Sequence, residues 1–145
     1  MKQEFEKYLA EMKLSSFMVD NLNEKYKLIC AACGVDEFDE IFVSEGVSNA
    51  GIREYFMLWG FTEQLMCRIS INKSDITIYR YKNYIRLVMV NEVNFDLKSP
   101  NEESRLQYAV RRTDSEKSIT YSASGMNCKH LLKIAYDYFL PNVKD

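Results

Sequence analysis

The sequence is poor in the residues that most often carry catalysis or bind nucleotides. Its 145 residues include 1 His, so a histidine-based triad or a cluster of histidine metal ligands has at most one member. The 5 glycines are isolated, and no Gly-x-Ser-x-Gly motif marks a serine nucleophile. These absences disfavour histidine-dependent hydrolases, deaminases and nucleases, and they predict a protein that is not an enzyme and needs no cofactor. Catalysis by Asp or Glu with a loosely bound metal is the alternative left open.

The sequence also lacks long hydrophobic runs. No apolar run approaches the roughly 20 residues that a membrane span needs, and the run Leu87-Val88-Met89-Val90 is interpreted as a core strand. The amino terminus is charged and helical in pattern, without the apolar region of a secretory signal. The 4 cysteines of such a chain are expected to be reduced thiols, so we expect a cytoplasmic protein with no membrane partner.

The excess of one sign of charge is also small. The net charge is −2, although residues 1–62 hold 6 Lys and Arg against 11 Asp and Glu, and residues 63–145 hold 13 against 10. A nucleic-acid-binding protein usually shows a stronger basic excess on one face. The charge asymmetry therefore identifies no partner by itself.

Hydrophobic and aromatic residues are plentiful. They make up 47% and 13% of the chain, and the aromatic residues include 10 Tyr, which suits a core dominated by β-sheet. The length and the lack of low-complexity tracts predict a single domain, residues 1–145. A domain of this size buries roughly two-thirds of its unfolded surface and needs no disulfide to fold.

Residues 1–34 have the spacing of two helices. Phe5, Leu9 and Met12 lie on one side of the first. Ser15 or Ser16 can cap the second, which Gly34 ends. Residues 35–40 are acidic, and we interpret them as a solvated connector.

Residues 40–123 have the alternation of short antiparallel strands. Residues 40–45 and 53–61 predict a hairpin, and further strands are predicted at 65–71, 76–79, 85–97, 106–110 and 119–123. An amphipathic helix within residues 124–140 closes the chain. We therefore predict an α+β fold: two helices, then an antiparallel meander of about seven strands forming a curved sheet or open barrel, closed by a carboxy-terminal helix.

This order of elements resembles that of pleckstrin-homology-like domains, in which seven antiparallel strands precede a helix that plugs one opening. The resemblance implies that fold but no function, because no residue motif accompanies it. The loop between the first two strands, residues 45–50, is acidic and neutral, whereas phosphoinositide binding in the pleckstrin manner calls for a basic loop. A sandwich with helices on one face of the meander is the alternative fold.

Cys30, Cys33, Cys128 and His130 form a candidate zinc set. Thiols at i and i+3 on a helix can share a metal ion or form a redox pair. Cys33 lies on an apolar stripe, however, and Cys128-Lys129-His130 is not a usual zinc spacing, so core packing is favoured and no metal is predicted. We interpret His130 as a partly exposed residue near the start of the last helix.

An aromatic and basic hairpin is predicted at residues 79–86. Basic residues between aromatic ones can hold phosphates and stack bases, although cross-strand pairing of Tyr with Arg on a solvent face is the simpler interpretation. The candidate binding residues here are Tyr79, Arg80, Tyr81, Lys82 and Arg86.

Trp59 lies in the most apolar strand, which is hydrophobic on both faces. Either the amino-terminal helices cover its second face, or the strand presents an exposed patch to a partner. Gly60 suggests a bulge or the close approach of another group. Trp59 is therefore a further candidate binding residue.

These features together predict a small, cytoplasmic, non-enzymatic binding domain whose partner is another protein or a second copy of the chain. The alternative is nucleic-acid or phosphate-ligand binding through the hairpin at residues 79–86.

Overall fold

The computed structural model describes residues 1–47, 53–81, 88–93, 99–112 and 116–143. The chain begins with two helices, α1 (Gln3–Glu11) and α2 (Ser16–Cys33), as the sequence predicts. Ser15 caps α2, because its Oγ accepts a hydrogen bond from the Met18 N–H at 3.2 Å. Gly34 ends α2 with a φ of 68°, a left-handed conformation that glycine adopts without steric cost.

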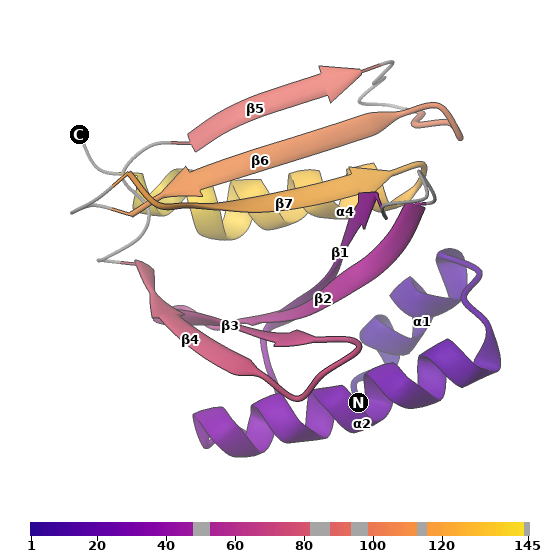
Figure 1. Ribbon diagram of the computed structural model, residues 1–145, viewed down its shortest axis with the longest axis vertical. Helices are drawn as coiled ribbons and strands as arrows, with labels where there is room; N and C mark the ends of the chain where they lie inside the picture. Colours follow the sequence, from indigo (N-terminus) through magenta and orange to yellow (C-terminus); the bar gives the residue numbers. More distant parts are fainter. Residues whose placement is uncertain (48–52, 82–87, 94–98, 113–115, 144–145) are drawn as a thin grey trace.

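In the described part of the chain seven strands follow, in two antiparallel sheets (Figure 1). The first has the order β1-β2-β3-β4 and contains β1 (Glu40–Val47), β2 (Arg53–Phe61), β3 (Leu65–Ser70) and β4 (Ile76–Arg80). The second has the order β5-β6-β7 and contains β5 (Val88–Val93), β6 (Arg105–Arg111) and β7 (Ser118–Ser124). The pairing of β1 with β2 confirms the predicted hairpin.

The prediction of a single meander forming one curved sheet or open barrel is wrong. The chain changes sheet between β4 and β5, and among the described residues no ladder joins β4 to β5 or β1 to β7. Alternating hydrophobicity shows which face of a strand is buried, but it does not show which strand lies beside it. The α+β class, the antiparallel pairing and the carboxy-terminal helix are confirmed.

In β1 and β2 the first sheet is buried on both faces. Phe42, Trp59 and Phe61 point into the core shared with the second sheet. Val43 and Leu58 point to the other side, against α1 and α2. The sequence predicts two alternatives for the strand of Trp59: a core strand covered on both faces, or an exposed patch. Trp59 is 1% exposed, so the strand is a covered core strand. Figure 1 shows α2 running along the outer side of this sheet.

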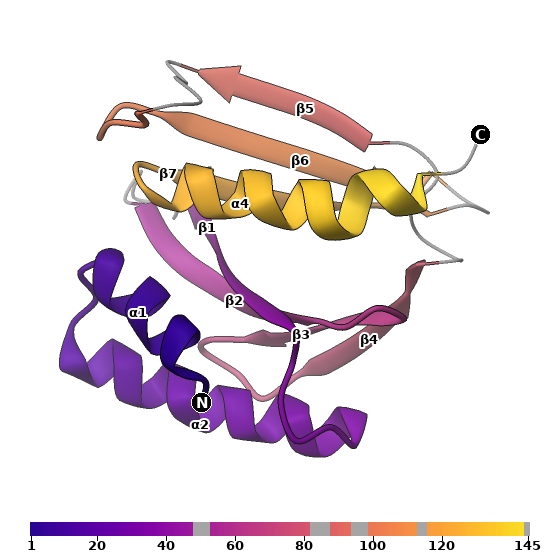
Figure 2. The same ribbon diagram turned by 180° about the vertical axis from the view of Figure 1, so that it is seen from behind.

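The last helical segment closes the core between the sheets. It consists of α4 (Asn127–Ile134), a π-helical turn η1 (Ala135–Phe139) and a 3₁₀ turn η2 (Leu140–Asn142). Its buried side chains, which pack in the inner core, are Cys128, Leu131, Ile134, Ala135 and Phe139. Figure 2 shows α4 lying across β6 and β7, with α1 near its amino-terminal end.

Gly60 of β2 allows the close approach of another side chain, the fully buried Phe38. A Cβ at Gly60 would lie 2.7 Å from Cγ of the Phe38 ring.

Gly60→Ala should therefore lower the free energy of unfolding by about 1–3 kcal/mol, measured by chemical denaturation. The double variant Gly60→Ala, Phe38→Leu should lose less unfolding free energy than the two single variants lose together, because the smaller side chain at position 38 relieves the overlap. Additive losses would contradict this account.

Candidate functional site

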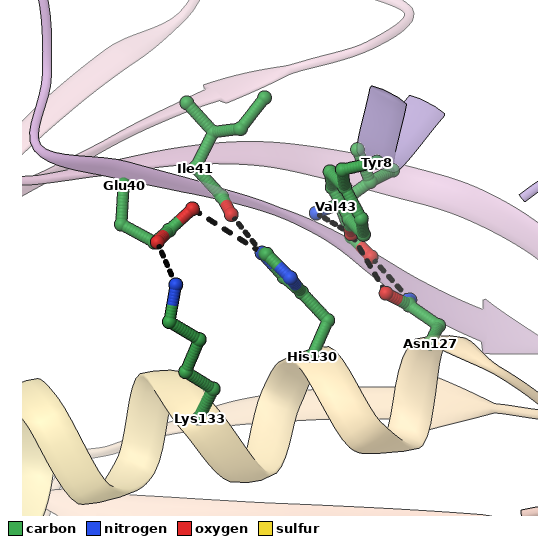
Figure 3. Close-up of polar contacts among 7 residues, drawn as sticks. All are labelled: Tyr8, Glu40, Ile41, Val43, Asn127, His130 and Lys133. Atoms are coloured by element: carbon green, nitrogen blue, oxygen red, sulfur yellow. Dashed lines mark hydrogen bonds and ion pairs between the residues drawn. The ribbon is translucent and has the colours of Figure 1, made fainter. Parts of the chain in front are cut away.

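The outer edge of β1 is covered by side chains of α1 and α4 (Figure 3). Asn127 donates from Nδ2 to the Val43 carbonyl at 2.9 Å, and its Oδ1 accepts from the Tyr8 hydroxyl at 2.7 Å. The Tyr8 hydroxyl in turn accepts from the Val43 N–H at 3.0 Å. The N–H and C=O groups of Val43 are therefore both hydrogen-bonded, although they face the edge of β1 opposite to β2.

Two further side chains of β1 connect it to β7. Ser44 Oγ accepts from the Ser122 N–H at 3.2 Å. The buried Glu45 carboxylate accepts from the Ser124 N–H at 2.7 Å, from the Ser124 hydroxyl, and from Asn127 Nδ2 at 3.0 Å. A register shift between Ser44 and Glu45 marks a β-bulge there. The two sheets therefore meet through side-chain hydrogen bonds where a closed barrel would have a backbone ladder.

Titratable groups complete the contact between β1 and α4. Glu40, whose side chain is 8% exposed, accepts from Lys133 Nζ at 2.8 Å. His130 Nε2 lies 2.6 Å from the Ile41 carbonyl oxygen and 3.7 Å from Glu40 Oε1. Because a carbonyl only accepts, neutral His130 carries its proton on Nε2. The Tyr8 ring stacks on the imidazole with centroids 3.8 Å apart.

Burial and hydrogen bonds shift the pKa values of His130, Tyr8 and Lys133 in this cluster. Burial lowers the pKa of His130 below its ordinary 6.5, and Lys133 acts in the same direction, whereas the Ile41 carbonyl and Glu40 oppose the shift. Burial also raises the pKa of Tyr8 well above its usual value, so its hydroxyl remains a donor. The hydrogen bond to Glu40 raises the pKa of Lys133. At neutral pH the cluster therefore holds a neutral imidazole, a neutral phenol and a matched ion pair.

A groove of about 520 Å³ adjoins this cluster, between α1 and α4. We call it the α1–α4 groove, and its lining residues are Tyr8, Glu11, Met12, Met126, Lys129, His130, Leu132, Lys133 and Tyr136. A smaller hollow of about 290 Å³ shares Glu11, Met12 and Met126 with it. The volume of the groove lies in the range of known ligand sites.

The structure separates the four candidate zinc ligands. Cys30 and Cys33 lie at the end of α2 and pack in the hydrophobic cluster between the helices α1 and α2 and the first sheet. Cys128 lies in the core between the two sheets, and His130 faces β1. Across the described part of the chain, no three His, Cys, Asp or Glu side chains are grouped so that they could hold a metal ion. Cys33 instead neighbours Cys67, whose thiol pKa is raised by burial.

Among the described residues of the hairpin predicted at 79–86, the aromatic rings are not at the surface. Tyr79 and Tyr81 are both buried in the inner core, and Arg80 between them is exposed. Lys82 and Arg86 lie outside the described residues. The rings of Tyr79 and Tyr81 therefore pack in the core and do not form the expected stacking surface.

Sequence reasoning missed the residues that anchor the site: Tyr8, Glu40, Glu45 and Asn127. Interpreting Glu40 as part of a solvated connector was wrong, because the structure buries it beside Lys133. A usable signal was its place directly before the apolar residues Ile41-Phe42-Val43, since a carboxylate that enters a buried strand needs a cationic partner. Asn127 had no local signal, because Tyr8 and Val43 lie 119 and 84 residues away in the sequence.

Comparisons of the chain with protein-family models, with curated proteins and with solved structures found no match. Among the helices of the described residues, none has the length and apolar character needed to cross a membrane.

The Tyr8 hydroxyl should contribute measurably to stability. Tyr8→Phe leaves the Val43 N–H and Asn127 Oδ1 buried without this partner, so the free energy of unfolding should fall by about 2 kcal/mol. Tyr136→Phe is the matched control, because Tyr136 is 54% exposed, and it should change stability by less than about 0.5 kcal/mol. Equal losses in the two variants would contradict the role given to Tyr8.

Stability should also depend on the protonation of His130. Its pKa is lower in the folded than in the unfolded protein, so the unfolded state binds the proton more readily, and stability falls as pH decreases below about 6.5. His130→Gln should show a shallower decline between pH 7 and pH 5, measured by denaturant unfolding at each pH. Parallel declines in the two proteins would refute this assignment.

Proposed function

We propose that this protein is a small non-enzymatic binding domain that takes an apolar segment of another protein into the α1–α4 groove. The observation that carries the proposal is the groove itself, about 520 Å³ in volume, with Met12, Met126, Leu132 and Tyr136 among its lining residues. Exposed apolar side chains beside a concave surface are typical of interaction sites.

The base of the groove supports this reading. Tyr8, His130 and Lys133 line it, and each is held by a partner on β1. A site whose side chains are already fixed loses little conformational freedom when a ligand binds. The same hydrogen bonds commit these titratable groups to structural partners, which favours binding over a chemical step.

We further propose a cytoplasmic location and a pleckstrin-homology-like arrangement. All four cysteines, each within the described residues, are thiols, in keeping with a reducing compartment. Two antiparallel sheets of four and three strands, closed by a carboxy-terminal helix, support the arrangement. Nucleic-acid or phosphate-ligand binding at residues 79–86 has less support, because Tyr79 and Tyr81 are buried.

A peptide-display selection against the wild-type protein tests the proposal. Enriched peptides should bind the double variant Met126→Glu, Tyr136→Glu at least tenfold more weakly than wild type, measured by fluorescence anisotropy, because carboxylates replace apolar contacts. The two side chains are 52% and 54% exposed, so the fold should be retained.

The matched control is Phe17→Glu, which alters an 81% exposed side chain on α2, outside the groove. Its affinity for the enriched peptides should equal that of the wild type. The proposal fails if no peptide is enriched, or if enriched peptides bind the double variant as tightly as the wild type.

A further inference from the structure

Exposed hydrophobic side chains are concentrated on the last helical segment. Of the seven large hydrophobic residues that are exposed among the described residues, Tyr136 and Leu140 lie in this segment and Met126 and Val143 flank its two ends. Met126, Lys129, Lys133, Tyr136 and Leu140 follow one another at alternating intervals of three and four residues. We call these five residues the α4 stripe: Met126, Lys129 and Lys133 share one side of α4 by their spacing, and Tyr136 and Leu140 follow in the π-helical and 3₁₀ turns.

The spacing of the α4 stripe is suited to a helical partner. Side chains three and four residues apart form ridges that pack into the grooves of a second helix. The part of the stripe from Met126 to Lys133 extends about 10 Å at the rise of an α-helix, which is about two turns of a partner helix, and Tyr136 in the following π-helical turn lines the same groove. Four of its five residues also line the α1–α4 groove, so a helix placed there would touch α4 on one side and Met12 of α1 on the other.

The charges of the α4 stripe specify the partner further. The stripe contains Lys129 and Lys133 and no acidic residue. Lys133 is neutralised by Glu40 at 2.8 Å, whereas Lys129 is exposed and has no carboxylate within ion-pair distance among the described residues. A carboxylate on the partner, placed to meet Lys129, would complete the pairing.

The same charges argue against a second copy of the chain as the occupant. Two copies of the α4 stripe packed together would bring two unpaired lysines, Lys129 of each copy, into one interface, and neither stripe supplies a carboxylate. Like charges placed together at an interface disfavour the complex.

We propose that the occupant of the α1–α4 groove is an amphipathic helix of another protein, with apolar residues at three- and four-residue spacing and an acidic residue that pairs with Lys129. This inference rests on the proposed function and adds the conformation and charge of the partner segment.

Charge reversal with designed peptides tests the inference. The probe is an 18-residue stapled helical peptide with a leucine stripe and Glu at both edges of that stripe; a second version carries Lys at those positions. The wild-type protein should bind the Glu peptide at least tenfold more tightly than the Lys peptide, by fluorescence anisotropy. Lys129→Glu should reverse this preference, and raising the salt concentration should reduce it.

Lys73→Glu is the control, because it makes the same charge change at an exposed turn between β3 and β4. It should leave the preference unchanged. An unchanged preference in Lys129→Glu would overturn the inference. Binding of an extended, proline-containing peptide of the same composition, lost in Met126→Glu, Tyr136→Glu, would overturn the helical partner but keep the proposed function. Failure of both peptides and of the display selection would overturn both.

Discussion

The Asn127 carboxamide joins three elements that are far apart in the sequence. Its oxygen accepts from Tyr8 of α1, and its nitrogen donates to Val43 and to Glu45 of β1. Asn127 is also the first residue of α4, so these bonds fix where that helix begins on the core. A buried amide costs free energy unless it is hydrogen-bonded, so this position is satisfied only when α1, β1 and α4 are all in place. The rest of the site follows from that requirement.

Covering the edge of β1 with side chains produces the groove. α1 and α4 are both attached to β1, through Tyr8 on one side and through Asn127 and His130 on the other, and the α1–α4 groove lies between the two helices. A strand at this edge would have satisfied the same backbone groups but would have left no such concave surface. The side chains that stabilise the fold therefore also shape the surface that we propose binds a partner.

The sequence predicts the local elements well and their assembly poorly. Ser15 and Gly34 mark the ends of α2 because caps are local interactions, and the alternation around Trp59 marks a strand because burial acts on each side chain separately. The division into two sheets was missed because strand order depends on long-range pairing. The polar site was missed because Glu45 resembles a loop residue in the sequence, although its carboxylate is buried and accepts from Ser124 of β7.

Side chains accept hydrogen bonds from backbone N–H groups at the facing edges of β1 and β7, in the place of a neighbouring strand. Native-state hydrogen exchange of three amides tests this, because the Val43 amide donates to the Tyr8 hydroxyl and the Ser122 and Ser124 amides donate to side-chain oxygens of β1. These amides should be protected to the same degree as amides of the ladder between β2 and β3. Exchange at the rate of freely exposed amides would show that the edges are open and would contradict the account.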